Sequence, residues 1–177
     1  MKMKKLIASA VMTGILATGA SAASMHSYIG ACYSSGSMKI GQSYSEHFYG
    51  LRYGVYGVLK HGIFWGVNFF GKYGKIPSLN ADEAQYGMDL DLGYRVMEKI
   101  GLDIYGIGTM FYGNIGNEND EEVGNDIVGY GYGIGAGMNL FSRLRLIGEY
   151  KIYPKIESSI VTWKDRVAEI ALEFKLR

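Results

Sequence analysis

The stretch Tyr86–Val96, YGMDLDLGYRV, decides the fold because its alternate residues fall into two sets of opposite character. The apolar set is Tyr86, Met88, Leu90, Leu92, Tyr94 and Val96. The other set holds glycine and charge and is Gly87, Asp89, Asp91, Gly93 and Arg95. A helix would mix the two sets around its circumference, whereas a strand sends them to opposite faces. The stretch is therefore predicted to be a β-strand between two different environments.

The same alternation recurs along the chain and predicts eight strands. Their approximate ranges are 26–34, 47–59, 63–74, 86–98, 102–115, 128–141, 144–154 and 161–177. In the fifth strand Asp103 shares its face with apolar residues, which suggests a bulge that changes the phase. The connections are short turns at 60–62, 98–101 and 142–143 and longer polar loops at 35–46, 75–85, 116–127 and 155–160. Short and long connections in alternation predict an antiparallel up-and-down meander.

The composition of the chain favours one strand-rich domain. Its 177 residues include 26 glycines and 15 tyrosines, and 48% of them are hydrophobic, which excludes a disordered chain. Abundant glycine and tyrosine suit strands and turns better than helices.

The N-terminus is typical of a secretory signal peptide. A basic MKMKK is followed by the apolar LIASAVMTGILATG and by the small-residue site ASA, Ala20–Ala22. We therefore expect residues 1–22 to be a cleaved signal peptide and residues 23–177 to form the folded domain. Loss of three lysines leaves 15 basic and 17 acidic residues, a formal charge of −2. Nucleic acid is an unsuitable partner for such a chain, since it requires a basic face.

The fold class predicted from these features is all-β, an eight-stranded antiparallel up-and-down transmembrane β-barrel. Most of the strands reach the roughly nine to eleven residues that cross a bilayer at a tilt. Aromatic residues also gather near the strand ends, where a membrane barrel carries its two girdles. Alternation alone does not exclude a soluble barrel with its apolar face inside. The nearly uncharged apolar face favours the membrane form.

Charges of both signs fall on the opposite face and are predicted to lie in the lumen. They are Arg52, Lys72, Arg95, Arg145, Lys151 and Lys175, against Asp89, Asp91, Asp103, Glu149, Glu169 and Glu173. Buried charges are costly unless they are paired, so equal numbers predict a salt-bridged interior. Eight strands enclose only enough space for side chains, which argues against a broad pore.

The glycine-rich run Asp126–Leu140, DIVGYGYGIGAGMNL, raises the question of a nucleotide site. A dinucleotide fingerprint needs G-x-G-x-x-G between a strand and a helix, and no helix is expected downstream. We therefore expect no cofactor. The five alternating glycines instead predict a bare lumen wall, against which either long side chains lie or a thin water-filled passage runs.

With its signal peptide, eight alternating strands and four outer loops, the chain resembles the small outer-membrane barrels of Gram-negative bacteria. These are barrels of the opacity-protein and OmpA-membrane-domain type, porin-family-like in architecture. The last strand, VAEIALEF, is similar to the family's C-terminal assembly signal, although KLR follows Phe174 here. The resemblance implies an outer-membrane monomer with a structural or adhesion-like surface role through its outer loops. Implied partners are outer-membrane lipid, lipopolysaccharide, the barrel-assembly machinery and host or matrix surface molecules.

Other functions are weighed against this one. A narrow channel is the first alternative, and a lipid A-modifying enzyme is the second. Ser43–His47, SYSEH, has catalytic residue types, but the arrangement of His and Ser two apart on one strand face is not expected there. We predict no enzyme activity. The acidic stretch 117–126 lacks the regular ligand spacing of a calcium loop, so no metal is expected.

Two further features are interpreted from the sequence. Basic residues near the outer rim are predicted to contact lipopolysaccharide phosphates, namely Lys151, Lys155, Lys164 and Arg166. The single cysteine, Cys32, follows a sequence that loosely resembles a lipoprotein attachment box, but a strand thiol is the favoured reading.

Overall fold

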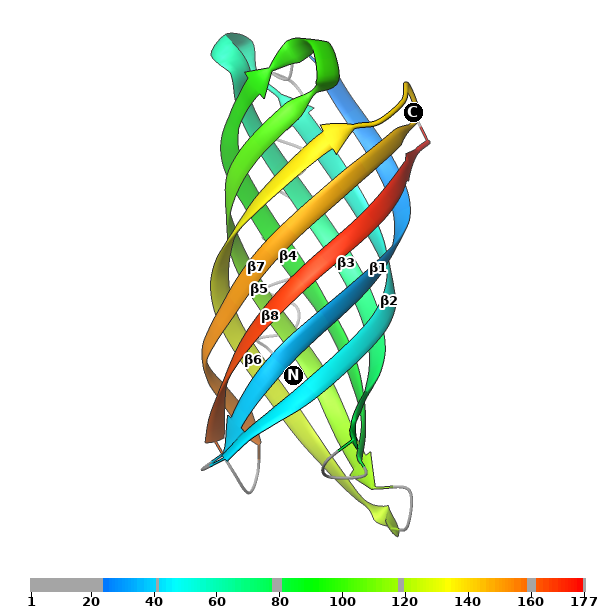
Figure 1. The fold of residues 1–177 in the computed structure, drawn as a ribbon, viewed down its shortest axis with the longest axis vertical. Helices are drawn as coiled ribbons and strands as arrows, with labels where there is room; N and C mark the ends of the chain where they lie inside the picture. The colour runs from blue at the N-terminus through cyan, green and yellow to red at the C-terminus, as the bar shows by residue number, and fades with distance from the viewer. Residues whose placement is uncertain (1–23, 41, 78–80, 118–119, 159–161, 177) are drawn as a thin grey trace, which may run out of the picture.

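The computed structural model describes residues 24–40, 42–77, 81–117, 120–158 and 162–176, which form a closed β-barrel (Figure 1). Each strand pairs antiparallel with its neighbours in sequence, and β8 pairs with β1. The strands are β1 Ser24–Ile40, β2 Gln42–Val58, β3 Ile63–Ile76, β4 Ala81–Met97, β5 Leu102–Asn117, β6 Asp120–Asn139, β7 Leu144–Ser158 and β8 Thr162–Lys175. The predicted eight-stranded up-and-down topology is confirmed. The predicted signal peptide, residues 1–22, lies outside the described residues.

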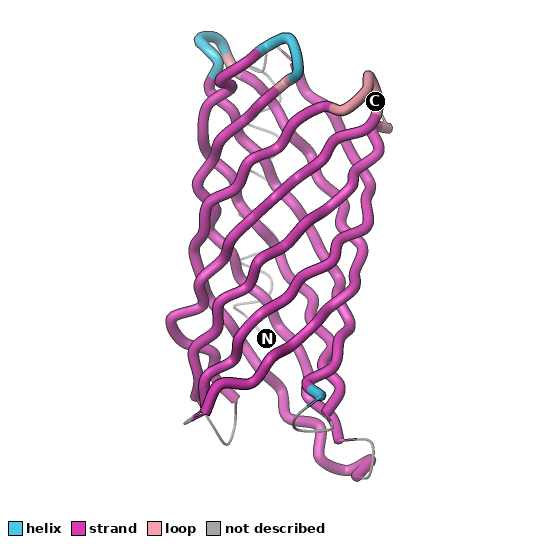
Figure 2. The backbone as a smooth tube through the Cα atoms, viewed as in Figure 1, coloured by secondary structure: helices cyan, strands magenta, loops and turns pink. Residues whose placement is uncertain are grey.

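The two ends of the barrel differ (Figure 2). One end, here called the turn end, carries the short 3₁₀ helices η1 Lys60–Gly62 and η3 Glu98–Ile100 and the turn at 140–143. The opposite end, here called the tip end, joins β1 to β2, β3 to β4, β5 to β6 and β7 to β8. In the described part of the chain, no helix has the length and apolar character needed to cross a bilayer.

The predicted long loops are wrong, because most of their residues continue the strands. The segment 35–46, for example, is divided between β1 and β2, and Ser37 stands directly opposite Ser45. Outward positions there are polar, but single apolar residues keep pointing inward. The inward residues are Met38, Ile76, Ile127 and Ile156, all buried. They give the tip end a hydrophobic core of its own, so the barrel wall continues where loops were expected.

The predicted phase change in β5 is also wrong. The pairing of β4 with β5 runs without interruption from Ala81 opposite Asn117 to Arg95 opposite Asp103. Asp103, Tyr105, Ile107, Thr109 and Phe111 are all buried and all point into the lumen. Apolar residues on this face fill the interior and do not signal a bulge. The register shifts instead between Arg95 and Met97 on β4 and between Ile115 and Asn117 at the tip end of β5. It also shifts at Tyr130/Tyr132 on β6 and at Tyr153/Ile156 on β7.

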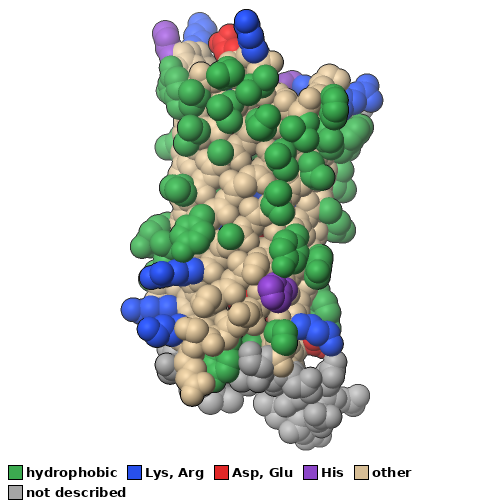
Figure 3. Space-filling model, viewed as in Figure 1, with side chains coloured by type: hydrophobic (Ala, Val, Ile, Leu, Met, Phe, Trp, Pro, Cys, Tyr) green, Lys and Arg blue, Asp and Glu red, His purple; other side chains and the backbone are tan. Residues whose placement is uncertain are grey.

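The apolar sets of the strands face outward, as predicted. Figure 3 shows hydrophobic side chains spread over one face of the barrel. Leu92 is 67% exposed, whereas its inward neighbour on β4, Asp91, is 4% exposed. A soluble barrel with its apolar face inside would show the reverse. A band of tyrosines borders the apolar surface on its tip side: Tyr33, Tyr49, Tyr73, Tyr86, Tyr112 and Tyr130. Tyr94, Phe141 and Phe174 lie exposed toward the turn end.

The glycine run on β6 forms a bare wall that neighbouring side chains cover. A Cβ atom added to Gly129 would lie 2.1 Å from the Phe111 ring, and one added to Gly135 would lie 2.4 Å from the Tyr105 ring. At Gly137 it would lie 2.4 Å from the Arg145 guanidinium. Large side chains from β5 and β7 therefore occupy the space that the glycines leave. Of the two arrangements expected for this wall, the structure shows the filled one.

A single added methyl group on this wall should destabilise the barrel. In Gly133→Ala the new Cβ would lie 2.3 Å from the backbone oxygen of Tyr150, which cannot turn away. We expect a loss of about 1–3 kcal/mol in the free energy of unfolding, measured by urea unfolding in lipid vesicles. Gly148→Ala is the matched control, because nothing lies within 4 Å of its added Cβ. Equal stability of the two variants would contradict the close packing of the wall.

Candidate functional site

Arg52 is the centre of the charge network inside the barrel. Its guanidinium lies 3.1 Å from Glu149, 2.8 Å from Glu169 and 2.9 Å from Glu173, counted between the nearest N and O atoms. The arginine projects from β2, whereas its partners come from β7 and β8, which do not pair with β2. Arg52 is 2% exposed, so these ion pairs join strands that are not neighbours, in the absence of bulk solvent.

Lysines extend this network toward the tip end. Lys151 Nζ lies 2.6 Å from Asp89 and 2.9 Å from Glu149, and Lys72 pairs with Glu169. Lys151 is fully buried, so its predicted contact with lipopolysaccharide is wrong. Its position on β7 has the same parity as Arg145 and Glu149, which places it in the lumen.

A second group of charges lies toward the turn end. Asp103 accepts hydrogen bonds from Arg145 at 2.7 Å and from Arg95 at 2.8 Å. Asp91 accepts a hydrogen bond from the Asn68 amide at 2.6 Å. Lys175 is half-buried where β8 ends. The structure therefore brings together the charged residues that were predicted to share the lumen, apart from Lys175 at its margin.

Aromatic and aliphatic clusters pack in the lumen on both sides of the Arg52 network. Toward the turn end, Tyr28, Tyr56, Phe64 and Tyr105 pack with one another and with Cys32. The Tyr56 and Tyr105 hydroxyls donate to Glu173 and Glu149, at 3.0 and 3.1 Å. At the tip end, the cluster around Met38, Ile76 and Ile127 fills the interior. Cys32 is the predicted strand thiol, buried inside the barrel.

The sequence analysis missed three carboxyl groups in the tip half of the lumen. Glu46, Glu83 and Asp165 are each 2% exposed or less. Glu46 and Asp165 share a hydrogen bond, and the Gln85 amide donates to Glu83 at 2.6 Å. All three lie beyond the tyrosine band, since Glu46 and Glu83 are each three residues past a band tyrosine, Tyr49 and Tyr86. Their inward parity was the available signal. Glu46 and Glu83 were missed because their segments had been predicted to be loops, whereas Asp165 lies in the predicted strand 161–177 and was not assigned to the lumen.

Burial raises the pKa of each of these carboxyl groups. The pKa of Glu46 rises to about 11, first by burial and then by the hydrogen bond with Asp165. The pKa of Glu83 rises to about 7 by burial, although the hydrogen bond from Gln85 opposes the shift. Burial also raises the pKa of Asp165, against the lowering effect of hydrogen bonds from Glu46 and from the Arg166 and Ser37 backbone. At neutral pH a protonated Glu46 therefore donates to Asp165, since two adjacent buried carboxylates repel.

A basic groove lies on the outer surface at the tip side of β6, β7, β8 and β1. It has a volume of about 520 Å³, and we define it by Lys39, Tyr132, Ile152, Pro154, Lys164 and Arg166. The register shifts in β6 and β7 lie beside it. Figure 3 shows the Lys and Arg side chains that gather on this part of the face. Two of the predicted lipopolysaccharide contacts, Lys164 and Arg166, line the groove, and the third, Lys155, is exposed next to Pro154.

Lys39 and Lys164 stand directly opposite each other across the β1–β8 pairing. Like charges in this cross-strand position repel and destabilise a sheet. An anion bound between them would remove the repulsion. Lys39 was not among the residues predicted from the sequence, because its segment had been predicted to be a loop.

The candidate catalytic residues of Ser43–His47 are arranged differently from expectation. Ser45 and His47 are both exposed on the same face of β2, so the expectation that no Ser and His lie two apart on one face is wrong. The His47 ring, however, forms its hydrogen bond with the Tyr33 hydroxyl, at 2.9 Å, and Glu46 points into the lumen. A serine nucleophile needs a base that a carboxylate or similar group orients, and Glu46 does not serve that role here.

Metal binding finds no support in the described part of the chain, where no three His, Cys, Asp or Glu side chains are grouped to hold an ion. The acidic stretch considered for calcium, 117–126, is a different case. Its side chains up to residue 125 lie outside the described part.

Neither a family model nor a curated protein sequence matches this chain. Among solved structures, the barrel is similar to Ail, the attachment invasion locus protein of Yersinia pestis, in complex with the heparin analogue sucrose octasulfate. That likeness has a TM-score of 0.60 and 11% identity, and it covers 86% of this chain and 99% of that chain. Ail in a second crystal structure gives a TM-score of 0.59 and 13% identity, over 85% and 98% of the two chains.

A third similar structure is Neisserial surface protein A, with a TM-score of 0.56 and 12% identity over 85% of this chain and 98% of that chain. At these identities the likeness shows the fold alone. It confirms the closed, eight-stranded antiparallel barrel.

Removal of Arg52 should be among the most damaging changes to the interior. Arg52→Met leaves three buried carboxylates without their shared cation, so we expect a loss of about 3–5 kcal/mol in the free energy of unfolding. Urea unfolding in vesicles measures it. Lys75→Met is the control, because the Lys75–Asp82 ion pair is exposed and such pairs contribute about 1 kcal/mol or less. If Arg52→Met lowers the free energy of unfolding no more than Lys75→Met does, the proposed contribution of the network to stability is contradicted.

The buried tip carboxyls should make stability depend on pH. Because the pKa of Glu83 is raised in the folded state, the folded protein holds more protons than the unfolded chain between about pH 4.5 and 7. Stability should therefore fall as pH rises through this window. Glu83→Gln should remove about 1–3 kcal/mol of that fall, measured as unfolding free energies at pH 5 and pH 8.

The exposed Glu157 provides the control for this measurement, because Glu157→Gln should leave the difference between the two pH values unchanged. A fall in stability between pH 5 and pH 8 that is as large in Glu83→Gln as in the wild type would contradict the assigned direction.

Proposed function

We propose that this protein is a small outer-membrane barrel that serves the cell surface in a structural or adhesion-like role. The observation that carries the proposal is the paired wall that continues beyond the tyrosine band, with its own packed core of Met38, Ile76, Ile127 and Ile156. Such a wall holds a rigid end clear of the lipid, where it can meet other molecules. The apolar outer face and the aromatic residues at its two borders support insertion in a membrane.

The proposed orientation places the turn end in the periplasm and the tip end outside the cell. Short periplasmic turns are typical of outer-membrane barrels. Export by a cleaved signal peptide, residues 1–22, and assembly by the barrel-assembly machinery through the last strand belong to the same proposal. A monomer is proposed, because the barrel closes on itself and leaves no unpaired sheet edge.

The proposed ligand of the outer rim is an anionic saccharide that carries phosphate or sulfate groups. Lys39, Lys155, Lys164 and Arg166 supply the cations, and Ile152 and Pro154 give the groove apolar lining. The buried Asp165 is the acidic residue that lines it. Lipopolysaccharide would supply phosphates from the cell's own membrane, and a host glycan would supply sulfates. The complex of Ail with a heparin analogue supports testing the second source.

The two alternative functions receive less support. A narrow channel requires a continuous passage, whereas described side chains cross the lumen as ion pairs and close it with packed layers. An enzyme requires an oriented base beside Ser45, whereas the His47 ring forms its hydrogen bond with the Tyr33 hydroxyl. We therefore propose a role without catalysis.

Loss of the groove cations should weaken binding of anionic saccharides. We expect Lys164→Gln/Arg166→Gln to lower affinity about tenfold or more, at about 1 kcal/mol for each cation. Binding would be measured with refolded barrel against heparin, against lipopolysaccharide, and against lipopolysaccharide stripped of its phosphates. Lys75→Gln, also exposed and at the tip end, is the matched control and should bind as the wild type does.

The separate arms identify the source of the ligand. A loss with heparin alone favours a host glycan, and a loss with phosphorylated lipopolysaccharide alone favours the cell's own lipid. Unchanged binding in both arms would contradict the role assigned to the groove.

A further inference from the structure

The turn end of the barrel is strongly basic. Its turns carry Lys60, His61, Lys99, Arg143 and Lys175, and Glu98 is their only acidic residue within the described segments 59–62, 97–101, 140–143 and 175–176. Figure 3 shows Lys and Arg side chains along this end. A positively charged rim attracts anions from the surrounding solution and from the membrane surface.

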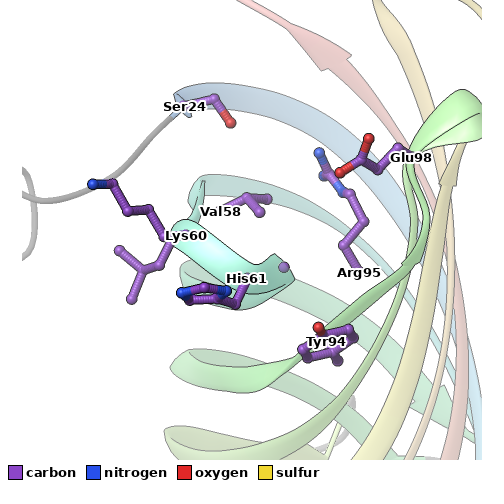
Figure 4. Close-up of a pocket in the computed structure, with 9 residues that line it drawn as sticks. Ser24, Val58, Lys60, His61, Tyr94, Arg95 and Glu98 are labelled. Atoms are coloured by element: carbon purple, nitrogen blue, oxygen red, sulfur yellow. The ribbon is translucent and has the colours of Figure 1, made fainter.

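A pocket of about 660 Å³ opens in this rim between the β2–β3 turn and the end of β4. Its polar lining comes from Lys60, His61, Arg95 and Glu98, and its apolar lining includes Leu59. Figure 4 shows Arg95 and Glu98 lying opposite the turn that carries Lys60 and His61. The pocket therefore combines three basic side chains with an apolar wall, a lining suited to an amphiphile with an anionic head.

The charge at the base of the pocket is positive. Arg95 donates to Asp103 through Nε and Nη2, at 2.8 and 3.2 Å, which uses two of the five N–H donors of a guanidinium. Asp103 also binds Arg145, so two cations share one carboxylate. The Arg95 side chain is 22% exposed, whereas Asp103 is fully buried. The positive charge of Arg95 is therefore accessible from the pocket, whereas its partner carboxylate, Asp103, is buried below it.

The pocket lies at the border of the apolar outer face. Tyr94, which faces outward and lines the pocket, is 53% exposed, and Phe141 on the same rim is 72% exposed. Aromatic residues mark the level of the head groups in a membrane barrel. Arg95 follows Tyr94 directly, and Lys60 and His61 lie on the adjacent turn. These side chains therefore lie near the height along the barrel at which aromatic residues mark the head groups.

We propose that this pocket binds the head group of an anionic phospholipid from the inner leaflet, with its phosphodiester held by Lys60, His61 and Arg95. The inference rests on the proposed insertion of the barrel, with the turn end toward the periplasm. Tyr94 and Leu59 contact the apolar part of the lipid nearest the head group. Glu98, at the edge of the pocket, accepts a hydrogen bond from a hydroxyl-bearing head group such as glycerol.

The backbone conformation of His61 determines which substitution can test its side chain. His61 has φ 68°, in the left-handed region that a residue with a side chain seldom adopts. Asparagine tolerates this conformation better than most residues. His61→Asn therefore removes the imidazole and keeps the turn.

Native mass spectrometry of the refolded barrel can test the site, with phosphatidylglycerol and phosphatidylcholine titrated into mixed micelles. The wild type is expected to retain one phosphatidylglycerol in preference to phosphatidylcholine. Lys60→Gln/His61→Asn should weaken that binding about fivefold or more. Lys99→Gln removes a positive charge from the same rim outside the pocket and should leave the affinity unchanged.

Each remaining outcome has a distinct meaning. Equal weakening by the pocket variant and Lys99→Gln would show attraction by the rim as a whole and overturn the pocket. A barrel that folds and inserts, shown by a heat-dependent gel shift, but has no preference for phosphatidylglycerol would also overturn it. A chain that does not insert in lipid would instead contradict the proposed function.

Discussion

The small space inside an eight-stranded barrel is the constraint on which the rest of this structure depends. Side chains that point inward from all sides meet, so each large group needs either a partner or a gap on a strand near it. Arg52 has partners, because three carboxylates from β7 and β8 surround its guanidinium. Phe111 and Tyr105 have gaps, because Gly129 and Gly135 carry no side chain. The glycines leave room for large side chains, and the salt bridges pair the charged ones, so both features allow side chains to fit into a narrow lumen.

The periodicity of the sequence was enough to predict the strand number, the topology and the inward face of the charged residues around Arg52. Period-two alternation reports directly which way a side chain points, so Arg52 and Glu169 could be placed in one lumen without knowledge of their contacts. Their pairing could not be predicted, because it depends on the tilt and stagger of strands that are far apart in sequence. The extent of the wall was also missed. Polar outward residues at 35–46 were interpreted as loop, although Met38 continued the inward pattern.

The same error explains which parts of the candidate sites were missed. Lys39, Glu46 and Glu83 lie on strand extensions, so neither their partners nor their burial could be inferred once those segments were assigned to loops. The assignment of Lys151 to an outer contact failed for a related reason, since nearness to the rim was given more weight than parity. In a barrel, parity decides whether a lysine meets solvent or carboxylates, whatever its height along the axis.

The seam between the first and last strands has a weak point near the tip end. From Tyr28 opposite Lys175 to Gly36 opposite Val167 the pairing of β1 with β8 is continuous, and beyond it Lys39 stands opposite Lys164. The pairing of β1 with β8 is therefore expected to be most stable toward the turn end and least stable where Lys39 and Lys164 repel each other. An anion bound between the two lysines would cancel their repulsion and stabilise this part of the β1–β8 pairing. A ligand at the outer surface would then increase the force needed to separate the first and last strands.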